Sequence, residues 1–243
     1  MATVFDVKVP LLLVAHGSRS AAADEVVREI AAAARERLDG ADVRVAYVDV
    51  RTPTVADAVA GLRADGLPGA VVLPAFLASG YHVRTDLPAQ LAEVGADPSR
   101  FVVTPALGPD RLLAEAALVR LRDAGLHPGD AVVLAAAGSS DPAALAEVRA
   151  AGRMLGSLLG RRVRVGFAAT AAPKIDALVD GLRRAGEDRI AVASWLLAPG
   201  VFHSRIEDSG ADVVGAPLGA HEDVVGAVVA RYRAGVEAGA AAA

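Results

Sequence analysis

The chain repeats one pattern twice, and this repeat limits the folds open to it more than any other feature. His16 ends an apolar run and precedes a Gly-Ser turn, and Ala137 does the same 121 residues later. His82 lies after another apolar run, and His203 follows it by the same 121 residues. Two copies of a pattern at a constant offset indicate two similar domains in tandem.

Within each copy, short apolar runs alternate with segments of helical periodicity. Continuous apolar runs are typical of strands covered on both faces, and alternating strands and helices pair in parallel through right-handed crossovers. We therefore expect an α/β fold of two tandem repeated domains, each a mainly parallel four-stranded sheet flanked by helices. In the first copy the predicted strands are 11–15, 43–50, 70–77 and 101–104, and the predicted helices are 21–38, one opened by Thr52-Pro53, and 110–123. The predicted domains are 1–126 and 130–243, and helix 110–123 closes the first of them.

Composition excludes several classes of function. The 243 residues include no cysteine, which removes disulfides, iron–sulfur clusters, thiolate metal sites and Cys nucleophiles. No apolar run approaches the ~18 residues of a membrane span, and no basic region precedes a signal-type core, so we expect a cytoplasmic protein without a membrane partner. A formal net charge of −4 and the lack of basic runs argue against nucleic acid as a partner. No dinucleotide-binding glycine fingerprint follows a predicted strand.

The candidate chemistry lies where predicted strands end. His16 directly follows the first strand, and His82 lies in the predicted loop 78–86 after the third. Parallel pairing places these strand ends on one edge of the sheet, where α/β proteins bind ligands, so the two imidazoles could face each other. Imidazole binds divalent first-row metals well. Asp49, at the end of the second strand, could cap the helix near Pro53.

The motifs around these residues resemble those of the class II chelatases, and most of all the long, two-domain sirohydrochlorin chelatases. The motifs are Val-Ala-His16-Gly-Ser-Arg, a strand followed by a Thr-Pro turn, and Phe-Leu-Ala-Ser-Gly-Tyr-His82-Val-Arg-Thr-Asp-Leu-Pro. The resemblance covers nearly the whole chain. It implies insertion of Fe²⁺ or Co²⁺, as metal substrate, into sirohydrochlorin, a tetrapyrrole with eight carboxylate side chains, for sirohaem or cobalamin synthesis. No permanently bound cofactor is expected.

The same resemblance implies roles for individual residues. His16 and His82 would be catalytic and would coordinate the metal. Asp49, which stands where the family usually has Glu, would assist them in catalysis as a carboxylate able to accept a pyrrole proton. Polar residues near the histidines are candidates for binding substrate carboxylates, through charged hydrogen bonds of about 1.5–3 kcal/mol each. These candidates are Ser18, Arg19, Gly80 and Arg84 in the first copy, and His203 and Arg205 in the second.

The two copies differ at the positions that carry chemistry. Where the first has His16, Asp49 and His82, the second has Ala137, Ala169 and His203. We therefore expect catalysis in the first domain, a degenerate site in the second, and a binding cleft between them. We also expect a monomer, in which the two domains are related by a pseudo-twofold axis.

Two other functions fit some of these residues. Phosphohistidine enzymes also place His-Gly at a strand end, but their motif carries Arg before the His, where this chain has Ala15. A non-catalytic carrier of metal or tetrapyrrole could use the same two histidines. The ligand set accepts iron, cobalt and nickel alike.

Overall fold

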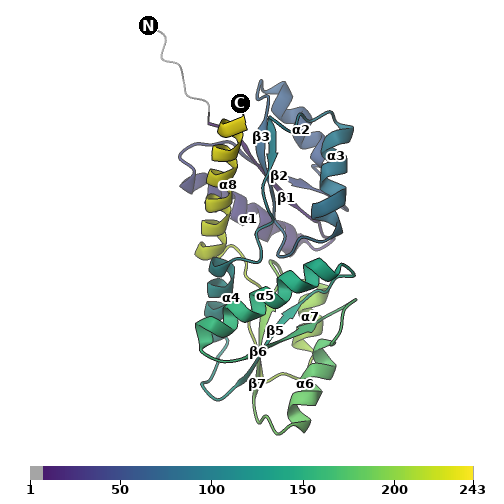
Figure 1. Ribbon diagram of the computed structural model, residues 1–243, viewed down its shortest axis with the longest axis vertical. Helices are drawn as coiled ribbons and strands as arrows, with labels where there is room; N and C mark the ends of the chain where they lie inside the picture. The colour runs from purple at the N-terminus through teal and green to yellow at the C-terminus, as the bar shows by residue number, and fades with distance from the viewer. Residues whose placement is uncertain (1–7, 243) are drawn as a thin grey trace.

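Two parallel sheets, one from each half of the chain, form the framework of the protein (Figure 1). The computed structural model describes residues 8–242, so the outermost parts of the two predicted domains, residues 1–7 and 243, lie outside it. The first sheet has the strand order β2-β1-β3-β4, and the second has the matching order β6-β5-β7-β8. These sheets confirm the predicted α/β fold class.

The elements follow one another as strand and helix in both halves. The first half contains β1 (Leu11–Ala15), α1 (Ala21–Arg37), β2 (Val43–Tyr47), α2 (Val55–Ala64), β3 (Ala70–Pro74), the π-helix η1 (His82–Asp86), α3 (Leu87–Glu93), β4 (Phe101–Val103) and α4 (Arg111–Asp123). The second contains β5 (Ala131–Ala136), α5 (Pro142–Leu159), β6 (Val163–Phe167), α6 (Ile175–Arg184), β7 (Ile190–Trp195), α7 (Val201–Glu207), β8 (Val213–Val214) and α8 (Glu222–Ala242). No helix within residues 8–242 is long and apolar enough to cross a membrane.

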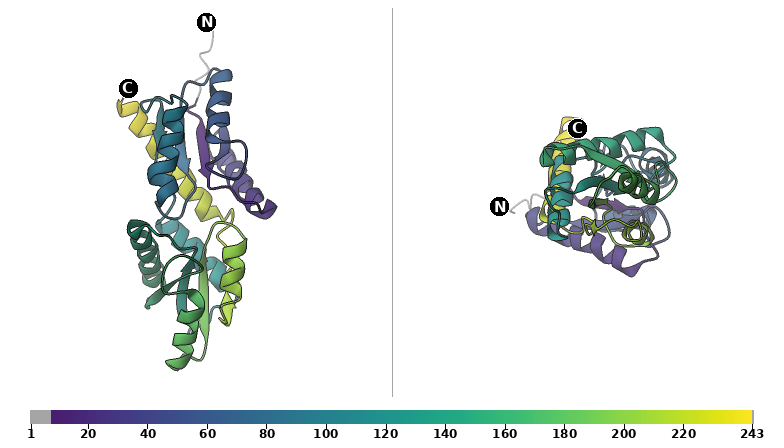
Figure 2. Two further views of the ribbon diagram at one scale, coloured as in Figure 1. Left: turned by 90° about the vertical axis from the view of Figure 1, so that its right-hand side faces the viewer. Right: turned by 90° about the horizontal axis from the view of Figure 1, so that it is seen from below.

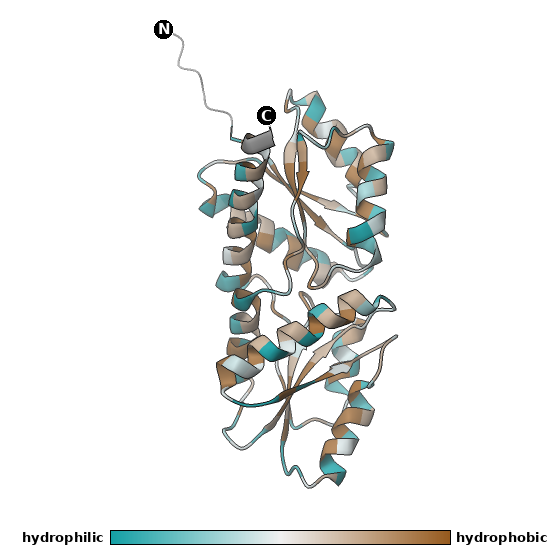
Figure 3. Cartoon of the chain, viewed as in Figure 1, coloured by the Kyte–Doolittle hydropathy of each residue, from teal (hydrophilic) through white to brown (hydrophobic). Residues whose placement is uncertain are grey.

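The central strands are apolar along their whole length because helices cover both faces of each sheet. All five residues of β1 are buried, and Figure 3 shows hydrophobic residues concentrated in the strands of each half. Successive residues of a strand point to opposite faces. Leu11 and Leu13 accordingly join a core shared by the two halves, whereas Leu12 and Val14 join a separate core under α2 and α3.

The last helix of each half packs against the other half. Helix α4 contacts β7 and α5 of the second half, and α8 contacts α1, β3 and β4 of the first, as the views in Figure 2 allow the reader to follow. The prediction that helix 110–123 closes the first domain is therefore wrong, although its bounds agree closely with α4. The reason is that its buried side chains, Leu113 and Leu121 among them, pack in the core shared by both halves. The division into 1–126 and 130–243 assigns each sheet to one part of the chain. That these two parts are separate domains stays a prediction.

Several element ends differ from the predictions. Strand β2 stops at Tyr47 instead of continuing to residue 50, because Tyr47 bridges to Thr54 and Val50 has a φ of 51°, outside the extended region. Strand β3 likewise ends at Pro74, where the prediction extends to residue 77. Helix α2 begins after Thr54, which forms a capping box with Asp57, and not at Thr52-Pro53.

Close packing of α8 on the first sheet depends on a glycine. A Cβ at Gly235 would lie 2.6 Å from Cγ1 of Val71 and 3.0 Å from Cγ2 of Thr104. Both atoms belong to short β-branched side chains on the sheet, which have little freedom to move aside. Gly235 therefore sets how near the crossing helix comes to β3.

We expect Gly235→Leu to lower the free energy of unfolding by about 1–3 kcal/mol, because the added side chain overpacks the contact between α8 and β3. Gly181 of α6 is the matched control, since a Cβ there has no atom within 4 Å in the described part of the chain. Gly181→Leu should raise stability by roughly 0.5–1 kcal/mol through helix propensity. Urea denaturation of both variants measures the difference, and equal effects would contradict this account of the helix crossing.

Candidate functional site

Two histidines meet at the carboxyl edge of the first sheet. Strands β1 and β3 are hydrogen-bonded neighbours, so His16 after β1 and His82 at the start of η1 emerge side by side. Their Nε2 atoms are 3.1 Å apart, and the rings stand edge to face with centroids separated by 4.4 Å. Phe76, two residues after the end of β3, stacks on His82, and the two ring centroids are 6.3 Å apart. The topology thus brings together the two imidazoles that the sequence singles out.

The hydrogen bond made by Nδ1 of each ring fixes which nitrogen carries the proton. Nδ1 of His16 lies 2.9 Å from the carbonyl oxygen of Gly17, and Nδ1 of His82 lies 2.8 Å from Oδ2 of Asp86. A carbonyl and an ionised carboxylate only accept, so we assign a proton to both Nδ1 atoms. In the neutral rings the two Nε2 lone pairs then face each other. A cation bound by both nitrogens would relieve this repulsion.

Asp86 is a site residue that the sequence analysis missed. Burial raises the pKa of its carboxyl group, but hydrogen bonds from His82 and Gln90 outweigh burial and leave the pKa below its usual value. Gln90 donates to Asp86 and to the carbonyl of Val48, which ties the carboxylate to the loop after β2. The available signal was the spacing His-x-x-x-Asp, which places both side chains on one face once residues 82–86 form η1. With a loop predicted at 78–86, this spacing did not indicate that the two side chains lie on one face.

The pair suits two neighbouring positions around one metal ion. At a typical metal–nitrogen distance of about 2.1 Å, nitrogens 3.1 Å apart subtend an angle of about 95° at the ion. Asp86 on the far side of His82 repeats the carboxylate–histidine–metal arrangement by which proteins orient a ligating ring. Among residues 8–242 no group of three His, Asp or Glu side chains could hold a metal.

Asp49 lies beside the pair without joining it. Its backbone N–H donates to the carbonyl of His16 at 3.0 Å, but its Oδ1 accepts from the N–H of Val50 and its side chain is exposed. Together with Asp86 and Gln90 it lines a neighbouring depression. The alternative that Asp49 caps the following helix is wrong, because Thr54 does so.

The histidine pair opens into a cleft between the two halves. The cavity measures about 550 Å³ and is lined by the ends of β1 and β3 on one side and of β5 and β7 on the other. His16, His82 and Gly80 line it from the first half, and Ala137 and Trp195 from the second. The indole N–H of Trp195 donates across the cleft floor to the carbonyl of Leu77 at 3.3 Å. The carboxyl edges of both sheets thus bound one cavity.

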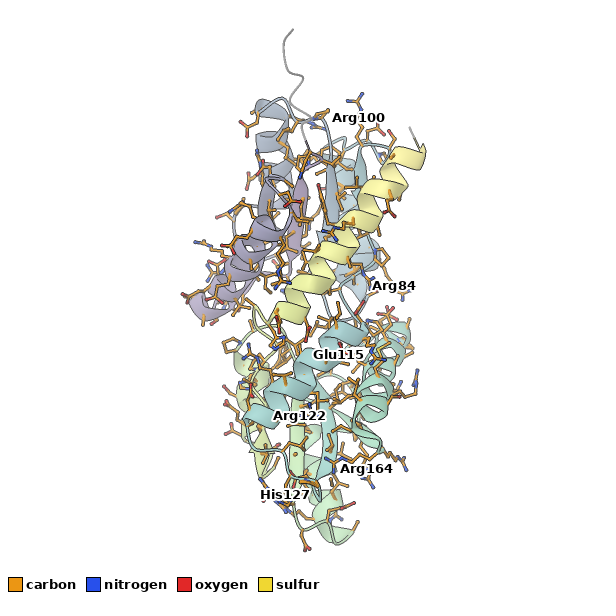
Figure 4. All side chains as sticks on the ribbon, turned by 90° about the vertical axis from the view of Figure 1, so that its left-hand side faces the viewer. Arg84, Arg100, Glu115, Arg122, His127 and Arg164 are labelled. Carbon is orange, nitrogen blue, oxygen red and sulfur yellow. The ribbon has the colours of Figure 1, made fainter. Side chains whose placement is uncertain are left out.

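Arg84 holds the two halves together at this cleft. It donates to the carbonyl of Ser79 at 2.6 Å, and it pairs with Glu147 at 3.3 Å and Asp141 at 3.7 Å, both from the second half. Glu147 also accepts from the N–H of Ser79 at 2.5 Å. Figure 4 shows Arg84 at the junction of the halves. Arg84 is predicted to bind substrate carboxylates. In the structure its guanidinium already pairs with two protein carboxylates.

Ser18 and Arg19 lie in a separate, cationic depression with Arg28 and Arg51. Arg28 and Arg51 share one carboxylate, that of the buried Asp24, at 2.9 and 3.4 Å. Asp24 also accepts a hydrogen bond from Tyr47, and burial with this bond raises the pKa of Tyr47 to about 12. The Ser18 hydroxyl accepts from the N–H of Ser20 at 3.1 Å, and Ser20 occupies the N-cap position of α1 without a hydrogen bond from its own side chain. Arg19 is exposed and is the cation best placed to meet an external anion.

The second half places its predicted residues elsewhere. The ring of His203 lies 3.5 Å from the carbonyl of Gly215 and 3.6 Å from Glu207, and its side chain is only 11% exposed. Arg205 approaches the carbonyl of Ala168 and lines a depression with Ala169 that corresponds to the one beside Asp49. Neither residue is among those that line the cleft. Their predicted contact with substrate therefore has no support in this geometry.

The fold and the site define a class of protein in which two similar α/β halves enclose a cleft and one half carries an imidazole pair. A family model described as CbiX matches residues 10–124 and again residues 131–234. The chain therefore belongs to the CbiX family. The double match also agrees with the repeat in the sequence.

Similar proteins include named chelatases. A sirohydrochlorin cobaltochelatase of Priestia megaterium is 25% identical over 207 residues, which are 82% of this chain and 67% of that protein. One of Methanopyrus kandleri is 39% identical over 83 residues, which are 34% of this chain and 58% of that protein, so the match spans under two thirds of its length. The structure of SirB from Bacillus subtilis with Fe³⁺ has a TM-score of 0.82 at 21% identity, covering 94% of this chain and 95% of that one. This structural likeness shows the fold.

We expect Asp86→Asn to weaken Co²⁺ binding about 10- to 100-fold, because an amide no longer fixes the Nδ1–H tautomer and orientation of His82. The matched control is Glu207→Gln, which changes the acidic residue four positions after His203 in the other half. Titration with Co²⁺, followed by its visible absorption bands, measures both affinities. An unchanged affinity in Asp86→Asn would remove Asp86 from the site.

Proposed function

We propose that this protein inserts Fe²⁺ or Co²⁺ into sirohydrochlorin, with His16 and His82 as the protein ligands of the metal. The observation that carries the proposal is the pair of Nε2 atoms, 3.1 Å apart and aimed at each other in a cleft between two domains. The names of the similar proteins, sirohydrochlorin cobaltochelatase and ferrochelatase, support the same substrate. Metal and tetrapyrrole are both substrates, and sirohydrochlorin is the small-molecule partner.

Two imidazoles hold a divalent ion without enclosing it. The open positions allow ring nitrogens of the tetrapyrrole to enter the coordination sphere before the histidines leave it. Metallation also releases two protons from pyrrole N–H groups. When the metal passes to the ring, the two Nε2 lone pairs become free and can accept these two protons. The same atoms thus serve first as ligands and then as bases, and the balance of charge at the site is kept.

Asp86 and Gly17 support this sequence by holding the Nδ1 protons. Each imidazole keeps its Nε2 directed at the other throughout, since its second nitrogen is bound to a fixed acceptor. A role for Asp49 in proton transfer stays a prediction, as do binding of substrate by Ser18 and Gly80, a monomeric state and a cytoplasmic location. A carrier of metal or tetrapyrrole is the second candidate, which the same two histidines favour.

We expect His16→Ala and His82→Ala each to abolish metal insertion without unfolding the protein, because both side chains lie at the sheet edge and outside the core. His203→Ala should retain most activity, since its ring is turned away from the cleft. Absorbance changes of sirohydrochlorin with Fe²⁺, Co²⁺ and Ni²⁺ in turn give the initial rates, and circular dichroism confirms folding.

Two outcomes of this assay would contradict the proposal. A loss in His203→Ala as deep as in His16→Ala would refute the division of labour between the halves. A wild-type protein that binds one equivalent of metal and tetrapyrrole without releasing metallated product would be a carrier.

We also expect sirohydrochlorin to bind more weakly as ionic strength rises, because an acidic protein can attract a polycarboxylate only through a local cationic patch. Arg19→Ala should reduce this salt dependence. Arg149→Ala, which removes an exposed cation of α5 outside the cleft lining and the Arg19 depression, is the charge-matched control. Equal salt dependence in wild type and Arg19→Ala would exclude Arg19 as an anchor.

A further inference from the structure

The cleft collects aromatic side chains in a chain that has few. Five Phe, three Tyr and one Trp are all the aromatic residues present. Four of these nine line the cleft, namely Phe76, Tyr81, Trp195 and Phe202. Phe76 and Trp195 have structural partners, since one stacks on His82 and the other bonds to Leu77. Tyr81 and Phe202 need a different explanation.

Both of these rings face water in the free protein. Tyr81 is 65% exposed and Phe202 is 43% exposed. Six large apolar side chains are exposed among the described residues, and the two aromatic ones both line the cleft. Two exposed aromatic rings that line one cavity make an apolar surface of the kind that a ligand covers.

The repeat relates the two rings to each other. Tyr81 precedes His82, and Phe202 precedes His203 by the same one position, 121 residues further on. In the second half the histidine has turned toward Gly215 and the partner positions have become alanine, yet the ring before it still lines the cleft. The second half has thus lost the metal ligands and kept the aromatic surface.

We propose that Tyr81 and Phe202 contact the faces of the tetrapyrrole ring from the two halves of the cleft, and that Phe202 is the substrate-binding residue of the degenerate half. This inference rests on the proposed function for the identity of the ligand. A tetrapyrrole has a flat conjugated face and a rim of carboxylates. Aromatic side chains match the face through offset stacking and burial, whereas cations such as Arg19 match the rim.

The position of Phe202 predicts what it contributes. It lies in the half that holds no imidazole pair, so its contact with the macrocycle is the same before and after the metal transfers. An interaction of this kind lowers KM and leaves kcat unchanged. Tyr81 stands edge to face with His82 at 5.7 Å, so a change there would disturb the metal site too. Phe202 is therefore the informative position.

The test measures binding of metal-free sirohydrochlorin through the fluorescence of Trp195, the one tryptophan of the chain, which lines the same cleft. Phe202→Ala should bind roughly tenfold more weakly, because only the exposed part of the ring becomes newly buried in the complex. Phe202→Leu keeps much of the apolar area and should lose less. Val201→Ala is the matched control, since Val201 is adjacent and more exposed but is not among the residues that line the cleft.

In the metallation assay, Phe202→Ala should raise KM by the same factor with kcat unchanged, and Co²⁺ binding without tetrapyrrole should equal that of wild type. Unchanged affinity of Phe202→Ala for sirohydrochlorin, or an equal loss in Val201→Ala, would overturn the inference. A wild type that binds sirohydrochlorin but never metallates it would refute the proposed function alone, because the binding comparison still decides the role of Phe202. A wild type that fails to bind sirohydrochlorin would overturn both.

Discussion

The parallel pairing of β1 with β3 is the constraint on which the site depends. Because the two strands run in the same direction and lie next to each other, the residues after them emerge at one edge within reach of each other. The sheet supplies the separation, and the acceptors Gly17 and Asp86 supply the orientation of the rings.

The contacts between the two halves are the second constraint on the site. The exchanged helices α4 and α8 join the cores of the two sheets, and Arg84 with Glu147 ties the loop before η1 to α5. These contacts fix the width of the cleft. The proposed metal site, with two histidines as its protein ligands, would depend on such a fixed surrounding, because the rest of the coordination sphere would come from a substrate held in the correct position.

The sequence allowed the fold class, the repeat and both histidines to be predicted, because each leaves a local pattern. Asp86 was not predicted, because its hydrogen bond with His82 forms only when residues 82–86 are helical. The Ser-Gly before these residues indicated a loop instead. The partners of Arg84 are more than fifty residues away and belong to the other half, so no local pattern could show that its charge is already used. The helix exchange was hidden by the repeat itself. Two similar sheets offer similar apolar faces, and the periodicity of α4 or α8 cannot tell which of the two it covers.

The exchange has a consequence for chains that contain the pattern only once. In the present fold, one half on its own would leave part of one sheet face uncovered and its final helix without a sheet to cover. Two such chains could each donate that helix to the other, and the result would be a domain-swapped dimer with the contacts seen here. The segment between α4 and β5 then acts as the covalent tether of a swapped pair, and it permits what two identical chains cannot have: one half carries the histidine pair while the other is free to differ from it.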